Sequence, residues 1–192
     1  ISYCVNAMEK FSSSGIGLYF SGNAKDPFTM KKARLVKQHF FSNPILDIGP
    51  GGTILNRFFF EKIGGYPEKY GPANDMYFNL KVCCETEIVF LPKLFLNYRI
   101  HEGQEKSNAY AYIYNNYRYL SDAMLLLPLG LSSKEIRYLR FKNNRRFVSN
   151  ILSYLIKSRN LENTRQLWIR SGFSFKNLVT GVFHYLKNPI NY

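Results

Sequence analysis

The sequence predicts an α/β domain followed by an all-helical extension. Hydrophobic residues make up 46% of the 192 residues and charged residues 20%, so the chain is expected to fold around a core. Short apolar runs alternate with helical patterns over roughly the first 105 residues, as in α/β layer structures. After Ser107 the apolar residues follow a helical period alone.

The N-terminal elements follow from apolar spacing and from breakers. Cys4, Ala7, Met8 and Phe11 recur at helical intervals, and Gly15 ends the pattern. Apolar runs predict short buried strands, whereas the polar, basic stretch with Pro27 and Pro44 predicts a loop region. The elements expected up to the first glycine turn are a helix from Cys4 to Phe11, a strand over 16–20, a loop region over 22–43 containing one helix at 30–39, and a strand over 45–48.

The next elements are separated by glycine and proline signals. Gly64 is expected to end a short helix in the left-handed conformation, and Asn74 or a neighbour is expected to cap the helix that follows. Pro92 separates two apolar runs that predict strands. These elements are a sharp turn over 49–52, an extended segment over 53–56, a helix over 58–63, a helix from 74 to about 84, and strands over 88–91 and 94–100.

The C-terminal part is expected to be helical and basic. Six apolar residues repeat at helical spacing before Pro189: Phe175, Leu178, Val179, Val182, Phe183 and Leu186. Residues 106–192 hold 14 Lys and Arg against 3 Asp and Glu, whereas residues 1–105 hold 12 against 10. The expected domains are therefore 1–105 and 106–192, and a polyanionic neighbour is expected for the second.

Composition also bounds the location of the protein. The longest apolar run, 123–131, is interrupted by Pro128 and is far shorter than the roughly 20 residues that span a bilayer. Cys4, Cys83 and Cys84 match neither a metal-binding pattern nor an even disulfide set. A reducing, cytoplasmic setting is expected, and the inner face of the cell membrane is the expected place of any peripheral attachment.

Three candidate motifs lie in order along the chain: Gly49-Pro50-Gly51-Gly52-Thr53 with Arg57 after it, Gly64-Gly65-Tyr66 followed by Asn74-Asp75, and Tyr98-Arg99-Ile100-His101 followed by Ser107. Each also has a purely structural interpretation. The first is a tight bend, Asn74-Asp75 is a helix start, and His101 is a surface histidine.

The order and spacing of these motifs, together with Leu91-Pro92, resemble the family 2 glycosyltransferases. The resemblance covers residues 1–107, and its specific part is 49–107. It implies an A-type (nucleotide-diphospho-sugar transferase) glycosyltransferase fold. It also implies transfer of a sugar from a nucleotide-sugar donor to a hydroxyl, with inversion at the anomeric carbon.

The same resemblance assigns roles to individual residues. Asp75 aligns with the catalytic base, and His101 with a position that helps to bind a divalent metal, Mn or Mg, or the diphosphate. The substrate-binding residues it implies are Gly51, Gly52, Thr53, Asn74 and Arg99. A carboxylate at a helix N-terminus is favoured as the anion, which prepares Asp75 to accept the proton of an attacking hydroxyl.

Two departures from the family pattern stand in the sequence. Position 74 is Asn where the acidic pair usually has Glu. The chain also has no Asp-x-Asp, since its aspartates are Asp26, Asp47, Asp75 and Asp122. The nucleotide-binding half and most metal ligands are therefore expected upstream of this chain, and the chain alone is expected to be inactive.

The basic tail leaves three interpretations open. Nucleic-acid binding has charge in its favour, but no helix-turn-helix, zinc-finger or RNA-binding signature accompanies it, so no nucleic-acid partner is expected. The second is that solvated helices pack on the catalytic domain. The third, preferred because Trp168, Phe175 and Phe183 accompany the basic residues, is attachment to an anionic membrane.

Two functions follow from these observations. The first is a bacterial glycosyltransferase for cell-surface polysaccharide or lipid-linked glycan synthesis. The alternative is a non-catalytic basic module that binds membrane or nucleic acid.

Overall fold

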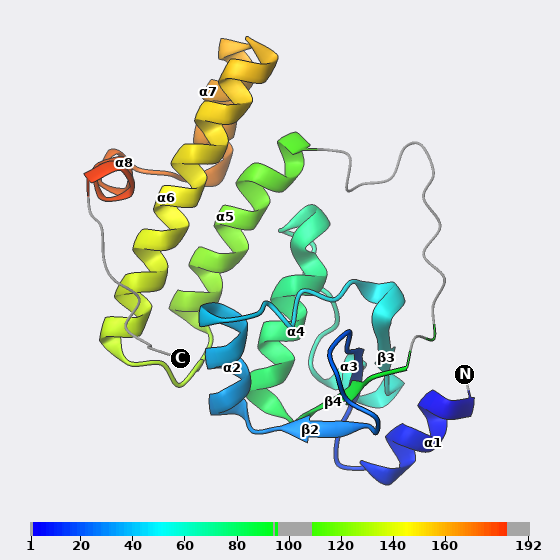
Figure 1. The fold of residues 1–192 in the computed structure, drawn as a ribbon. Helices are drawn as coiled ribbons and strands as arrows, with labels where there is room; N and C mark the ends of the chain where they lie inside the picture. Colours follow the sequence, from blue (N-terminus) through cyan, green and yellow to red (C-terminus); the bar gives the residue numbers. More distant parts are fainter. Residues whose placement is uncertain (1, 94, 96–108, 184–192) are drawn as a thin grey trace. The chain divides into compact units, whose positions relative to one another are not determined.

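The computed structural model describes residues 2–93, 95 and 109–183, and it divides into two compact units (Figure 1). The sheet-bearing unit contains described residues 2–68, 74–93, 95 and 127–130. The helical unit contains residues 69–73, 109–126 and 131–183. The predicted α/β class is confirmed. A domain boundary near residue 106 lies outside the described residues and stays a prediction.

A mixed four-stranded sheet forms the centre of the first unit, in the order β2-β4-β1-β3. Its strands are β1 (Ile16–Tyr19), β2 (Phe28–Met30), β3 (Thr53–Leu55) and β4 (Ile88–Leu91). The central pair, β1 and β4, is parallel, and both outer strands pair antiparallel to it. All four residues of β4 are buried, which explains why it has a continuous apolar run rather than an alternating one.

Four helices accompany the sheet: α1 (Ser2–Lys10), α2 (Lys32–Phe41), α3 (Arg57–Lys62) and α4 (Asn74–Glu85). The helix α1 packs Cys4 and Ala7 against Val89 and Leu91 of β4. The helix α3 begins after Asn56, whose side chain accepts a hydrogen bond from the Phe59 N–H. Gly64 follows with φ +87°, as its position predicted. All four helices were expected, with ends shifted by two residues or fewer.

The sequence failed to predict β2. Phe28–Met30 falls in the stretch assigned to a loop, and three residues are too few to show a period. Tertiary contacts form this strand: Phe28 pairs with Phe90 in the register and their rings stack with centroids 5.3 Å apart.

The predicted strand over 45–48 is wrong. The segment forms a turn and an irregular stretch, because its carbonyls accept hydrogen bonds from a side chain rather than from the backbone of a neighbouring strand. The buried amide of Asn79 on α4 donates hydrogen bonds to the carbonyls of Leu46 and Ile48, both at 2.9 Å. The other strand expected here, over 94–100, lies outside the described residues except for Phe95.

The second unit is helical, as predicted. Its helices are α5 (Ala109–Leu126), α6 (Ser133–Ser158), α7 (Leu161–Ser171) and α8 (Phe175–Phe183), with the short turn η2 (Gly71–Ala73) beside α5. Its core is built from Tyr117, Phe147, Ile151, Leu167 and Phe173. A capping box between Ser132 and Glu135 fixes the start of α6. None of the helices described here is both long enough and apolar enough to span a bilayer.

Candidate active site

The candidate site lies at the N-terminal end of α4, within the sheet-bearing unit. Asp75 stands in the first turn of this helix, and its Oδ1 accepts a hydrogen bond from the Met76 N–H at 2.8 Å. The glycine turn lies directly beside it, because a methyl group added at Gly49 would be 3.5 Å from Asp75 Oδ2. Two motifs separated by about 25 residues in the sequence are thus in contact.

The turn itself is a compact 3₁₀ turn, η1 (Pro50–Gly52). The Gly49 carbonyl accepts two hydrogen bonds, from the Gly52 N–H at 2.9 Å and from the Thr53 hydroxyl at 3.0 Å. Gly52 has no room for a side chain, since an added Cβ would lie 2.6 Å from Ile48 Cγ2. Gly51 is exposed, so the turn presents backbone rather than side chains beside the carboxylate.

An aromatic cluster supplies the other neighbour of Asp75. The ring of Tyr66 lies 4.7 Å from that of Phe78 and 5.2 Å from that of Phe60, measured between centroids. Burial raises the pKa of Tyr66, and the negative charge of Asp75 raises it further. The phenol therefore stays protonated near the carboxylate and has a donor to offer a bound molecule.

Burial also raises the pKa of Asp75 above its ordinary value, although the Met76 N–H acts in the opposite direction. The position at a helix N-terminus predicted a carboxylate favoured as the anion. The net direction differs because loss of water outweighs these favourable backbone contacts. A carboxylate with a raised pKa is a stronger proton acceptor once ionised.

Two residues that the sequence did not single out hold the turn in place. Asn79 lies one helical turn after Asp75 on α4 and bonds to the segment that leads into Gly49. His39 on α2 is buried, and its Nδ1 accepts a hydrogen bond from the Leu46 N–H at 3.3 Å. The available signal was a polar residue inside an apolar run for Asn79, in Phe78-Asn79-Leu80, and a polar residue beside an apolar pair for His39, in His39-Phe40-Phe41.

Comparison with protein-family models, curated proteins and solved structures gives no match.

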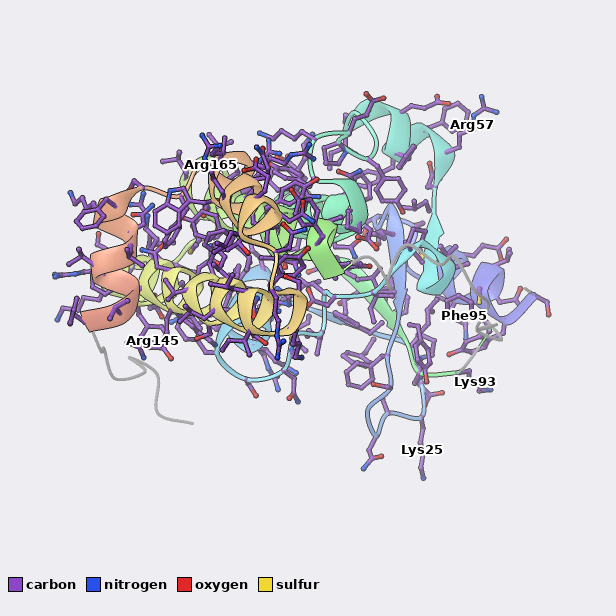
Figure 2. All side chains as sticks on the ribbon, turned by 90° about the horizontal axis from the view of Figure 1, so that it is seen from above. Lys25, Arg57, Lys93, Phe95, Arg145 and Arg165 are labelled. Carbon is purple, nitrogen blue, oxygen red and sulfur yellow. The ribbon has the colours of Figure 1, made fainter. Side chains whose placement is uncertain are left out.

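The remaining predicted residues are placed as follows. Asn74 is half-buried and is the first residue of α4 rather than the residue before it. Arg57 does not reach the carboxylate site, because its exposed guanidinium group points outward and pairs with Glu61 at 2.8 Å (Figure 2). Arg99 and His101 lie outside the described residues.

Metal binding is not accounted for by the residues near Asp75. Among residues 2–93, 95 and 109–183, no group of three His, Cys, Asp or Glu side chains is arranged to hold a metal ion. The site described here offers a carboxylate, a polar turn and a tyrosine.

Proposed function

We propose that this chain provides the acceptor side of an inverting glycosyltransferase with an A-type fold, and that Asp75 is its base. The observation that supports the proposal is the contact between Asp75 and the Gly49–Thr53 turn. The order of motifs suggested a base beside an acceptor loop, and these two motifs are neighbours in space. The proposed substrates are a nucleotide-sugar donor and a glycan or lipid-linked acceptor.

In the proposed reaction, Asp75 takes the proton of an acceptor hydroxyl as the oxygen attacks the anomeric carbon of the donor. A bond forms between the oxygen and that carbon, and the bond from the carbon to the diphosphate breaks with its electron pair on the diphosphate. In this proposal the exposed backbone of Gly51 and the hydroxyl of Tyr66 orient the acceptor. In this proposal a divalent metal supplies positive charge to the diphosphate when bound, through ligands other than the described residues.

The space beside Asp75 provides the test. Gly49→Ala should leave the fold intact, because Gly49 has φ −71° and ψ 171°, which any residue adopts, and its added methyl would make only ordinary contact. The methyl would nevertheless fill the position against the carboxylate that an acceptor hydroxyl must reach. We expect transfer to fall at least about tenfold, measured as nucleoside diphosphate release by the full-length protein, with the melting temperature unchanged.

The matched comparison is Gly52→Ala in the same turn, whose methyl meets Ile48 rather than Asp75. This variant should lose stability first. Wild-type turnover by Gly49→Ala would exclude the acceptor from the space beside Asp75 and contradict the proposal.

We also propose that the helical unit attaches the protein to an anionic membrane, on the evidence of α8. The side chains of Phe175, Val179, Val182 and Phe183 repeat at helical spacing and are all exposed. The opposite side of α8 packs closely on α6. Gly181 is buried there, and a Cβ added to it would lie only 3.0 Å from the backbone of Asn144. Trp168 differs from the expectation, because it packs against the core of the unit.

Vesicle binding should therefore have two components. At low salt, basic residues contribute about 1 kcal/mol each near an anionic surface, and this part should disappear as salt rises. The remaining binding should depend on α8, since buried hydrocarbon is not screened. In co-sedimentation at high salt, we expect Phe175→Ser with Phe183→Ser to reduce binding at least about tenfold.

The control is Leu161→Ser, which removes an apolar residue as exposed as these two from α7 instead. Equal loss in the control, or no preference for anionic over zwitterionic lipid, would contradict the attachment through α8.

A further inference from the structure

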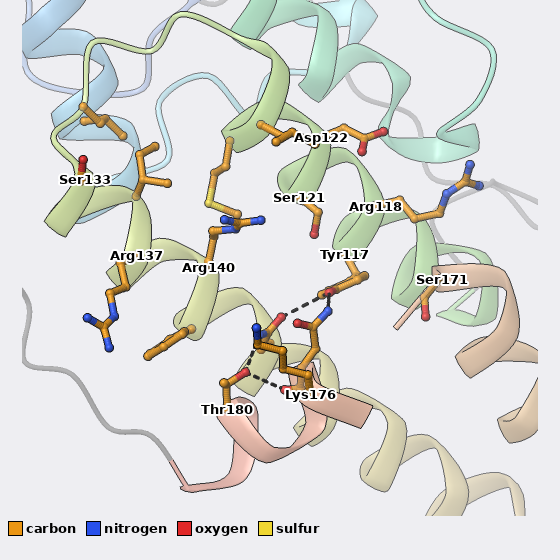
Figure 3. A pocket seen from close by; sticks show the side chains of 18 residues that line it. Tyr117, Arg118, Ser121, Asp122, Ser133, Arg137, Arg140, Ser171, Lys176 and Thr180 are labelled. Carbon is orange, nitrogen blue, oxygen red and sulfur yellow. Dashed lines mark hydrogen bonds between the residues drawn. The ribbon is translucent and has the colours of Figure 1, made fainter. Parts of the chain in front are cut away.

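A pocket of about 920 Å³ lies within the helical unit, lined by residues of α5, α6 and α8 (Figure 3). Four basic side chains from these three helices line it: Arg118, Arg137, Arg140 and Lys176. Figure 3 shows the guanidinium groups of Arg137 and Arg140 along α6, with Lys176 from α8 nearby. Four like charges around one pocket repel one another, so an anion that enters it is stabilised.

The protein itself provides little negative charge to this pocket. Its one acidic lining residue, Asp122, forms a 2.8 Å ion pair with Lys69 and accepts a 2.8 Å hydrogen bond from the Tyr70 hydroxyl. Within the described residues, none of the four basic side chains forms a salt bridge. Arg118 lies close enough to Asp122 to help lower the pKa of that carboxyl, and Arg137 lies over the Phe141 ring at 5.5 Å. The charges of Arg137, Arg140 and Lys176 are therefore available to a ligand.

One wall of the pocket is a fixed polar network. The Tyr117 hydroxyl donates to Asn144 Oδ1 at 3.2 Å and accepts from Asn177 Nδ2 at 3.0 Å. Asn144 Nδ2 in turn donates to the Thr180 hydroxyl at 2.8 Å. Because Tyr117 and Asn144 are buried and bonded across three helices, the network holds α5, α6 and α8 in register and fixes the positions of the basic residues.

A further part of the lining is apolar. Met124, Leu125 and Leu131 lie here with Ile136 and Phe141, and Leu125 is 68% exposed. A ligand with a charged end and a hydrocarbon part matches this division. A guanidinium group binds two phosphate oxygens through a pair of parallel hydrogen bonds. The guanidinium groups of Arg137 and Arg140 form no salt bridge with a described carboxylate, so they can bind phosphate in this way.

We propose that this pocket binds the phosphate or diphosphate group of a phosphorylated molecule, with the apolar lining taking its hydrocarbon part. The group comes either from a soluble phosphate ester or from the headgroup of a lipid. The pocket does not contain Asp75, so the proposal stands independently of sugar transfer.

The test measures binding of inorganic pyrophosphate by calorimetry and of phosphatidylcholine vesicles with and without phosphatidic acid by co-sedimentation, both in 0.1 M salt. The test variant is Arg137→Gln with Arg140→Gln, and the single change Lys176→Gln probes the pocket from α8. The matched control is Arg146→Gln with Lys157→Gln, since both are exposed on α6, lie outside the pocket and remove the same charge. Circular dichroism verifies that every variant is folded.

The pocket variants should weaken pyrophosphate binding at least about tenfold and the control less than about twofold. Pocket-dependent binding of pyrophosphate alone identifies a soluble ligand. Pocket-dependent binding of phosphatidic acid vesicles, displaced by pyrophosphate, identifies a lipid headgroup. Equal weakening in pocket and control variants would show a general electrostatic attraction and overturn the proposal, as would no binding of either probe.

Discussion

Asp75→Asn should lower sugar transfer by about 10²–10⁴-fold, the contribution typical of a general base. Asparagine keeps the shape of the side chain and an acceptor for the Met76 N–H, but it cannot take the proton of an attacking hydroxyl. The assay is nucleoside diphosphate release by the full-length protein with acceptor glycan. Glu85→Gln is the control, because it removes an exposed carboxylate from the other end of α4. Near wild-type turnover by Asp75→Asn would contradict the assignment.

The same substitution should not destabilise the protein at pH 7. The pKa of Asp75 is raised by burial, so the folded state holds the neutral acid more favourably than the anion. The ionised carboxylate therefore costs stability above the folded-state pKa, and that cost disappears below the ordinary value of 3.8. Since the group is half-buried and screened by water, we expect Asp75→Asn to gain at most about 1 kcal/mol at pH 7. Urea unfolding should show the gain shrinking as the pH falls.

Asn79→Ala should reduce the free energy of unfolding by about 2–4 kcal/mol and also reduce sugar transfer. The change removes the donors to the carbonyls of Leu46 and Ile48. A buried carbonyl left unpaired costs about 1–3 kcal/mol, and the cost is smaller at Ile48, where the bond is only partly buried. The segment that leads into the Gly49 turn would lose its hold on α4. Urea unfolding measures the loss of stability, hydrogen exchange of residues 46–53 measures the loosening of the segment, and nucleoside diphosphate release measures the loss of transfer.

Val82→Ala is the control for this variant, because Val82 is a fully buried apolar residue on the same helix. It should also cost stability, through lost packing, yet leave hydrogen exchange over 46–53 unchanged. Equal exchange in the two variants would show that Asn79 has no special role in positioning the turn.

Sequence alone predicted elements whose signals are local. Gly64 marked the end of α3 because a left-handed residue without a side chain is needed there, and the run over 88–91 marked a strand because both of its faces are buried. For the candidate site, the residue types and the order of the motifs came from sequence. Their closeness did not, because the approach of Gly49 to Asp75 depends on tertiary contacts.

The failures have one physical origin, which is pairing between distant residues. Phe28–Met30 is a strand only because β4 lies beside it, and residues 45–48 are irregular only because Asn79 bonds to their carbonyls. The raised pKa of Asp75 likewise depends on how its surroundings exclude water. A pattern along the chain contains none of these three facts.

The division of the chain has a consequence for dissecting the protein. Residues 69–73 fold with the helical unit, and residues 127–130 fold with the sheet. A cut near residue 105 would separate Tyr70, which is fully buried, from Asp122, to which its hydroxyl is bonded. No single truncation therefore yields two intact units. A fusion that carries only residues after 105 would lack residues 69–73 of the helical unit, and one that carries only residues before 105 would lack residues 127–130 of the sheet-bearing unit.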